Sequence, residues 1–164
     1  MRYFLIISVL IIFLSSCGSG VVVTHKWNRD ADFGRYNTYS FEAIEKLGSS
    51  NVLINDENMN YVKKAVRYEL DIRGYKMADS ADMHVKLDIK LDEYGKQGPT
   101  YGEGMILARL VIELKDAKTN EMVWWGGREG EAIRVTNKRE KRINRAVADI
   151  FEAYTFVAGD PIRY

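Results

Sequence analysis

Apolar and polar residues alternate strictly in the middle of this chain, from Met83 to Asp92. The apolar set is Met83, Val85, Leu87, Ile89 and Leu91, and the polar set is His84, Lys86, Asp88, Lys90 and Asp92. This period of two predicts a strand with one buried and one wet face, which is typical of an antiparallel sheet. A second strand is predicted over residues 105–115, and a third begins at 121 and continues toward 135. Residues 116–120 are expected to form the hairpin between them.

Two other segments carry apolar residues at helical spacing. The first predicted helix covers residues 57–73, with a stripe made of Met59, Val62, Val66 and Leu70 and widened by Ala65 and Ile72. Gly74 follows, at the position of a left-handed C-terminal cap. The second predicted helix covers residues 138–154, with a stripe made of Ile143, Ala146, Val147, Ile150, Phe151 and Tyr154. Asn137 and Glu140 have the spacing of a capping box at its start.

Two short segments rich in β-forming residues, 21–27 and 37–41, precede the first helix. The predicted order is therefore strand, strand, helix, three strands, helix. We expect an α+β fold in which an antiparallel sheet of about five strands carries both helices on one face, because this arrangement buries both apolar stripes. Gly126 and Gly127 are expected to bulge or bend the strand that contains them.

The first residues of the chain follow a different pattern. Arg2 precedes an almost wholly apolar run, residues 3–14, which ends in Ser15-Ser16-Cys17. The run is too short for a transmembrane helix, which needs about 20 apolar residues, and it has the layout of a secretory signal. The segment resembles the lipobox of bacterial lipoproteins. That resemblance implies cleavage just before Cys17 and attachment of fatty acyl groups such as palmitate to this cysteine.

This interpretation divides the chain into three parts. Residues 1–16 are the expected signal peptide, residues 17–20 the lipidated cysteine with a short tether, and residues 21–164 a single α+β domain. The acylated cysteine would hold the protein on a membrane of the bacterial cell envelope, facing the periplasm. Gly18 stands after the cysteine, where an Asp would resemble the signal for retention in the inner membrane, so the outer membrane is favoured.

Composition agrees with an ordered globular domain. Hydrophobic residues make up 46% of the chain, and there are only two prolines. Lys and Arg number 24 against 23 Asp and Glu. This balance gives no electrostatic argument for a nucleic-acid partner, and the export signal argues against one. The single cysteine is assigned to the anchor, so no disulfide is expected within the domain.

Several segments together resemble the envelope lipoproteins grouped as domain of unknown function 4136. The matching residues are Asp30, Asp32, Phe33, Tyr36, Thr38, Tyr39 and Phe41, then Leu70, Arg73, Gly74, Tyr75, Ala81, Asp82 and Val85, and finally Thr119, Val123, Trp124, Gly126, Ile143, Ala146, Val147, Ile150, Phe151 and Tyr154. The resemblance covers most of the chain after the signal. It implies a lipid-anchored α+β domain and no catalytic residue.

The candidate ligands for a metal or cofactor do not form a recognised pattern. His25 and His84 are isolated and have no cysteine partner, so no metal site and no cofactor are expected. Asp30 and Asp32 have a spacing found in calcium loops, but the glycine and distant glutamate of an EF-hand are missing. We interpret these two aspartates as structural residues that fix their loop by accepting backbone hydrogen bonds.

Three aromatic residues are candidates for contact with a partner. Trp124 and Trp125 are adjacent on a predicted strand, so they point to opposite faces. One is expected in the core, and the other is either an interaction residue or a side chain covered by a neighbour such as Arg128. Tyr101 lies in a glycine-bearing loop, residues 95–104, which lacks the Gly-Lys-Ser/Thr motif of a phosphate cradle. The loop is expected to be a flexible hairpin connection, in which an exposed Tyr101 could still contact a partner.

A basic run, Lys138, Arg139, Lys141 and Arg142, lies in the first turns of the second predicted helix. One interpretation is an ordinary solvated helix face. The other is contact with anionic lipid headgroups near the anchor, worth about 1 kcal/mol per basic residue.

No serine, cysteine or threonine of the chain sits in a recognisable nucleophile motif. The sequence therefore favours a non-catalytic, lipid-anchored binding or assembly module for another envelope component, protein or glycan. The alternative is an envelope hydrolase or metal-dependent enzyme that uses Asp30, Asp32 and carboxylates on the sheet face, such as Asp88 and Asp92.

Overall fold

A computed structural model describes residues 22–42, 56–93, 106–133 and 139–161. In chain order the elements are β1 (Val22–Trp27), the 3-10 helix η1 (Phe33–Arg35), β2 (Thr38–Phe41), α2 (Asp56–Asp71), β3 (Lys76–Met77), β4 (Met83–Glu93), β5 (Ile106–Asp116), β6 (Met122–Ile133) and α3 (Arg139–Phe151). Together they form the α+β fold that the sequence predicts.

The strands form one six-stranded sheet in the order β1-β6-β5-β4-β2-β3. β4, β5, β6 and β1 pair antiparallel, whereas β2 runs parallel to both β3 and β4. The expectation of about five strands, all antiparallel, is therefore wrong in detail. In the sequence, α2 lies between β2 and its two partner strands, β3 and β4. The helix therefore provides the crossover connection that parallel pairing requires. β3 has two residues, which is too short to show a period in the sequence.

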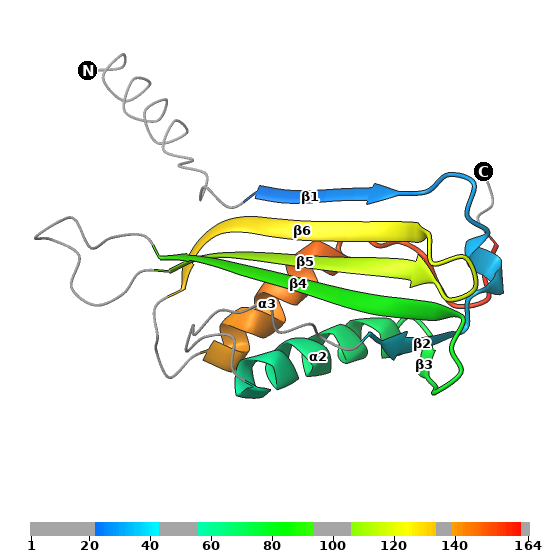
Figure 1. Ribbon diagram of the computed structural model, residues 1–164, viewed down its shortest axis with the longest axis horizontal. Helices are drawn as coiled ribbons and strands as arrows, with labels where there is room; N and C mark the ends of the chain where they lie inside the picture. Colours follow the sequence, from blue (N-terminus) through cyan, green and yellow to red (C-terminus); the bar gives the residue numbers. More distant parts are fainter. Residues whose placement is uncertain (1–21, 43–55, 94–105, 134–138, 162–164) are drawn as a thin grey trace, which may run out of the picture.

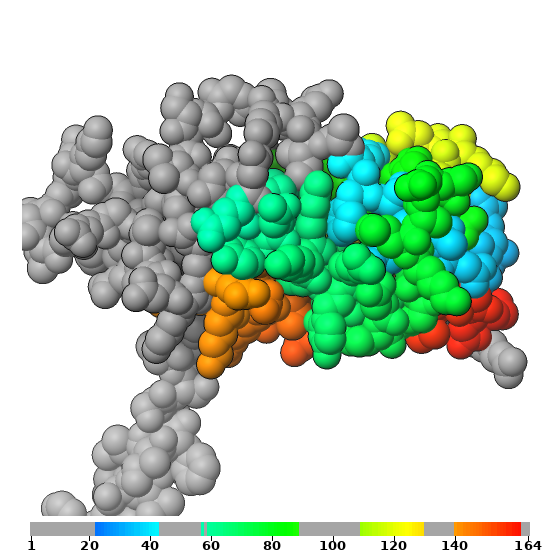
Figure 2. All heavy atoms as spheres, turned by 90° about the horizontal axis from the view of Figure 1, so that it is seen from below, coloured from blue at the N-terminus to red at the C-terminus, as the bar shows by residue number. Residues whose placement is uncertain are grey.

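Both helices lie on one face of the sheet, as predicted (Figure 1). Seen from below, α2 and α3 lie side by side on this face (Figure 2). The buried side chains between the layers include Trp124, Tyr39, Tyr75, Tyr154, Phe33, Phe151, Leu70, Met83, Ile112, Leu114, Ile150 and Val66. We call the opposite side of β1, β6, β5 and β4 the open face, because no helix in the described part of the chain covers it.

The helices are shorter than the sequence predicts. α2 ends at Asp71, and Gly74 then adopts the left-handed conformation, with φ of 87°. Ile72 therefore lies beyond the last helical turn and does not extend the apolar stripe, and it is 58% exposed. α3 ends at Phe151, but the turn that follows, closed by the Tyr154 N–H donating to the Phe151 carbonyl, keeps Tyr154 in the core.

Gly126 and Gly127 do not mark a bulge. The pairing of β5 with β6 shifts register elsewhere, between Ala108 and Leu110 and between Leu114 and Lys115. Gly126 instead makes room for the Trp124 indole, because a Cβ at Gly126 would lie 2.5 Å from Trp124 Cη2.

The last described segment closes the end of the molecule. The Ala158 N–H donates to the Arg73 carbonyl, and the Gly159 N–H donates to the Tyr36 carbonyl. The Phe156 ring stacks on Phe33, with ring centroids 3.6 Å apart. The residues after α3 therefore lie as an ordered strap across the loop that follows β1.

Candidate functional site

The residues that carry the family resemblance hold the fold together. Arg73 donates to the carbonyls of Glu69 at 2.7 Å, Phe151 at 2.9 Å and Tyr154 at 3.1 Å. It therefore donates to carbonyl groups at the C-terminal ends of both α2 and α3, where intrahelical donors run out. Tyr75 and Tyr154 share a buried hydrogen bond of 2.8 Å between their hydroxyl groups. These polar contacts are directed into the molecule, where they join α2 to the turn after α3.

A second group of polar residues joins η1, β2, β4 and the β5–β6 hairpin. The Asp116 carboxylate accepts hydrogen bonds from Arg35, from the Tyr36 hydroxyl at 2.9 Å, and from the Lys118 and Thr119 N–H groups at 2.7 and 3.0 Å. Asp82 lines the same small cavity of about 100 Å³.

The ionisation states of Asp116 and Tyr36 fit a structural role, in which both groups hold the fold together. Desolvation raises the pKa of Asp116, but the Thr119 and Lys118 N–H groups, Tyr36 and Arg35 outweigh it and lower the pKa to about 2. Burial, together with the hydrogen bond to this carboxylate, raises the pKa of Tyr36 to about 12. Asp116 thus stays ionised and Tyr36 stays protonated at neutral pH, and neither is poised for proton transfer.

The Asp82 carboxylate, like that of Asp116, accepts several hydrogen bonds from the protein. It accepts from the Asn37 and Thr38 N–H groups at 3.0 Å and from the Thr38 hydroxyl at 2.8 Å. Desolvation raises the pKa of Asp82, and the hydrogen bonds from Asn37 and Thr38 outweigh it, so the net shift is downward.

The two loop aspartates lie apart from this group of bonds. Asp32 caps η1, where its side chain accepts from the Gly34 N–H at 3.1 Å. The Asp30 N–H donates to the Asn28 side chain at 3.0 Å, and both aspartates are exposed. Within the described ranges, no three His, Cys, Asp or Glu side chains lie together as metal ligands would.

The two adjacent tryptophans lie in different layers. Trp124 is completely buried, with its ring 5.0 Å from Tyr154 and 5.7 Å from Phe151. Trp125 lies on the open face and is half-buried. A Cβ on Gly127 would lie 3.3 Å from Trp125 Cζ3, so the indole extends over this glycine. Of the two adjacent tryptophans, Trp125 is therefore the one that a partner can reach.

Trp125 belongs to a row of side chains that crosses four strands. Lys26 of β1 and Glu113 of β5 stand directly opposite Trp125, and Lys86 of β4 stands opposite Glu113. We call Lys26, Trp125, Glu113 and Lys86 the Trp125 row. Directly opposite residues in an antiparallel pair project from the same face, so the row presents an aromatic surface between charged groups.

Arg128, which the sequence offered as a cover for the outer tryptophan, lies elsewhere. It is buried on the helix side of the sheet, where its Nε is 3.2 Å from the Asp149 carboxylate of α3. The alternation of the strand explains the difference, because Arg128 and Trp125 are three residues apart and face opposite sides.

The remaining sequence candidates are only partly visible. Cys17, Tyr101 and Lys138 lie outside the described residues. Arg139 is the first residue of α3, and Lys141 is exposed and Arg142 partly exposed on the same helix.

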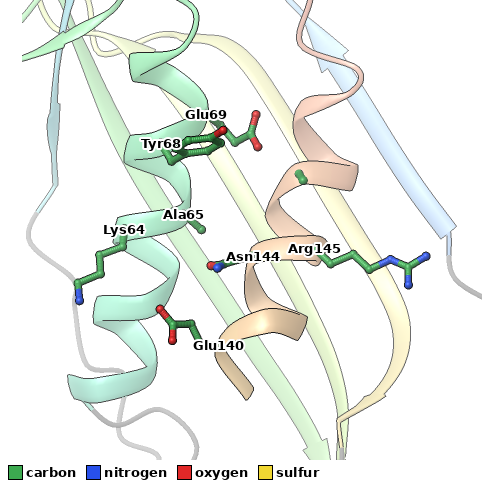
Figure 3. Close-up of a pocket in the computed structure, with 8 residues that line it drawn as sticks. Lys64, Ala65, Tyr68, Glu69, Glu140, Asn144 and Arg145 are labelled. Carbon is green, nitrogen blue, oxygen red and sulfur yellow. The ribbon is translucent and has the colours of Figure 1, made fainter. Parts of the chain in front are cut away.

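The sequence does not reveal a groove of about 480 Å³ between α2 and α3 (Figure 3). Lys64 and Arg145 point away from it on opposite sides. Ala65, Asn144 and Ala148 also line the groove. Glu69 and Glu140 are its acidic residues, and Glu69 is already bound to Arg73, with Nη1 and Oε2 2.6 Å apart. The two small alanines, one on each helix, are the signal that could have indicated the groove.

The family model for the domain of unknown function (DUF4136) matches residues 23–154. The chain belongs to this DUF4136 family. No curated protein matches the sequence.

Two solved structures resemble the DUF4136 domain in fold. A PDZ domain protein from Parabacteroides distasonis aligns over 88% of this chain with a TM-score of 0.60 and 15% identity, and the chain spans only 37% of that protein. The PelC dodecamer from Paraburkholderia phytofirmans aligns over 84% of this chain and 99% of PelC, with a TM-score of 0.53 and 11% identity. At these identities the likeness shows the fold alone.

None of the helices in the described part of this DUF4136 chain is long and apolar enough to cross a bilayer.

Proposed function

We propose that this DUF4136 protein is a non-catalytic, lipid-anchored module that binds another component of the bacterial envelope, protein or glycan, through the Trp125 row. The observation that carries the proposal is the position of Trp125. Its indole lies on the open face, whereas the polar side chains at the end of the sheet hold the fold together. Tryptophan is enriched among the residues that dominate binding energy.

The neighbours of Trp125 suit it to this role. Lys26 and Glu113 flank the indole with hydrogen-bonding groups of opposite charge. Gly127 has no side chain to displace the ring, so the indole can extend over it against the sheet. A pre-ordered aromatic ring loses little conformational entropy when a partner packs on it.

Anchoring through an acylated Cys17 is the second part of the proposal. β1 begins at Val22, so only a few residues would separate the lipid from the first strand. The domain would then lie close to the bilayer and face the periplasm. Gly18 in place of Asp favours the outer membrane.

The alternative of an envelope hydrolase receives less support. Asp82 accepts three hydrogen bonds from Asn37 and Thr38. Asp116 accepts hydrogen bonds from Arg35 and Tyr36 and from two N–H groups of its own hairpin. The exposed Asp30 and Asp32 lie in the loop after β1, away from the carboxylates of the open face. A general acid or base needs a free and perturbed group close to the reacting atom, and these carboxylates are not arranged in that way.

Binding through the Trp125 row is tested by Trp125→Ala in the full chain. A photo-crosslinking residue at the neighbouring Lys26 would first capture the partner in intact cells, and isolated cell-wall glycan would be tested by sedimentation. We expect Trp125→Ala to weaken binding about 30-fold, the effect of losing about 2 kcal/mol at a hot spot. Tyr68→Ala is the matched control, because Tyr68 is an exposed aromatic residue on the helix side. Equal binding by wild type and Trp125→Ala would refute this role.

The anchor is tested separately by Cys17→Ser. The variant should lose fatty-acid label and leave the membrane fraction, because the thiol that carries the lipid is gone. A chain that keeps its leader and its free thiol in the wild type would contradict the anchor but leave the binding surface intact.

A further inference from the structure

We propose that two copies of this chain associate edge to edge through β1, so that their sheets join into one continuous sheet. β1 is the first strand in the sheet order and pairs only with β6 among the described strands. All six of its residues are exposed. Unprotected edge strands are templates for pairing with another chain.

The outward main-chain groups of β1 follow from one hydrogen bond. The Asn28 N–H donates to the Val123 carbonyl at 2.8 Å, which makes the adjacent Trp27–Trp124 pair a pair without direct hydrogen bonds. Since main-chain groups alternate along a strand, the N–H and C=O groups of Val23, His25 and Trp27 point away from β6. These are the groups that a second strand would meet.

Half of the side chains on this exposed edge are large and apolar. Val22, Val23 and Trp27 are three of the exposed large hydrophobic residues of the molecule, and Trp27 is 38% exposed. Trp27 is held in place rather than free, because it stacks with His25 at 6.1 Å and meets Phe156 edge-on at 6.4 Å. Lys26, the one charged residue that would guard the edge, projects from the open face beside Trp125.

The sequence of β1 complements itself in one antiparallel register. With His25 opposite His25 of the second copy, Val23 stands opposite Trp27 and Thr24 opposite Lys26, on both sides of the two-fold axis. Val23 and Trp27 then meet each other, no like charges face each other, and every outward N–H and C=O of Val23, His25 and Trp27 has a partner. Val22 stands at the end of the pairing, opposite Asn28.

The neighbouring register is poorer. It places Thr24 opposite itself, sets Val22 against Lys26 and leaves Trp27 beyond the paired region. The self-complementary register is the reason for assigning a second copy, rather than an unrelated strand, to this edge, because a two-fold contact requires one surface to match itself.

Cysteine crosslinking in the full chain, purified in mild detergent, tests the register. In the proposed pairing the two residues at position 25 form a hydrogen-bonded pair with Cα atoms about 5.5 Å apart, which suits a disulfide. His25→Cys should therefore form a covalent dimer under mild oxidation. Thr24→Cys is the matched control, because its counterpart lies diagonally at about 7–8 Å. The chain without an added cysteine is the control for any disulfide that forms through Cys17.

Association itself is tested by sedimentation of the same full chain. His25→Pro removes an outward N–H while leaving the ladder to β6, as edge positions allow, and should reduce the mass from two copies to one. Val23→Lys tests the same contact without altering the backbone and should raise the dimer dissociation constant at least about tenfold. A wild-type chain that sediments as one copy at every concentration, or Thr24→Cys crosslinking as readily as His25→Cys, would overturn the pairing.

Discussion

At the scale of single residues, the contrast between Trp124 and Trp125 shows how a strand divides two identical side chains between two roles. Alternation along a strand sends adjacent side chains to opposite faces, and the sequence predicts this much. It cannot tell which ring is buried, because that depends on Gly126. The space above this glycine on the helix side accepts the Trp124 ring, and Ile150 of α3 closes it.

Gly126→Ala should lower the free energy of unfolding by about 1–3 kcal/mol, the usual cost of overpacking a core. The new methyl group would lie 2.5 Å from Trp124 Cη2 and 2.7 Å from Ile150 Cγ2, so rings and helix must move. Urea unfolding measures the change. Gly127→Ala is the control: its nearest contacts are 3.3 Å or longer and lie on the open face, so its effect should be clearly smaller. Equal losses in both variants would contradict the packing described here.

At the scale of elements, Arg73 joins the ends of two helices that are far apart in the sequence. One guanidinium satisfies carbonyl groups from α2 and from the turn after α3, and it also pairs with Glu69. The planar fork of arginine can reach several acceptors at fixed angles, whereas an ammonium group cannot. The helices need this residue because their last carbonyls have no intrahelical partner.

Arg73→Lys should therefore destabilise the fold by about 2 kcal/mol although the charge is kept, because carbonyls near the core lose their donors. The matched control is Arg67→Lys in the same helix, whose Nε lies 3.4 Å from Asp71 in an exposed pair and whose loss should cost under about 0.5 kcal/mol. Thermal or urea unfolding of both variants distinguishes them. If the two variants are equally stable, the guanidinium group of Arg73 is not required to join the two helix ends.

Periodicity predicted the elements of the fold more completely than their pairing. The long strands β4 and β5 and both helices have enough residues to display their period. β3 does not, and no local pattern reports that β2 runs parallel to β4. The position of β1 at the sheet edge is also a tertiary fact, set by pairing with β6, so its exposed residues could not be told from those of a central strand.

At the scale of the whole molecule, Asp116 ties the hairpin of β5 and β6 to η1 and Tyr36. Its folded-state pKa of about 2 lies below the ordinary value of 3.8. A lowered carboxylate pKa stabilises the folded state above the ordinary pKa, and that stabilisation is lost as the pH falls through the folded value.

The stability of the protein should therefore fall as the pH drops from about 4 to about 2. Asp116→Asn should be less stable than wild type by about 2 kcal/mol at pH 7, since hydrogen bonds to a charged acceptor are weakened. This difference should shrink below pH 4 and vanish near pH 2, as followed by urea unfolding at several pH values. Asp30→Asn, at an exposed loop position, is the control. A gap that stays constant down to pH 2 would exclude a charge effect.

Several contacts that close the molecule join residues that are far apart in the sequence. Arg73 meets the Phe151 carbonyl 78 positions away, Tyr75 meets Tyr154 79 away, and Arg35 meets Asp116 81 away. Distant contacts of this kind slow folding, because a large loop must close before they form. The contacts of Arg73 and Tyr75 cannot form while the ribosome still holds the last turn of α3. A polypeptide released short of Tyr154 would lack these contacts, and the apolar surface left exposed would make it a substrate for chaperones and proteases.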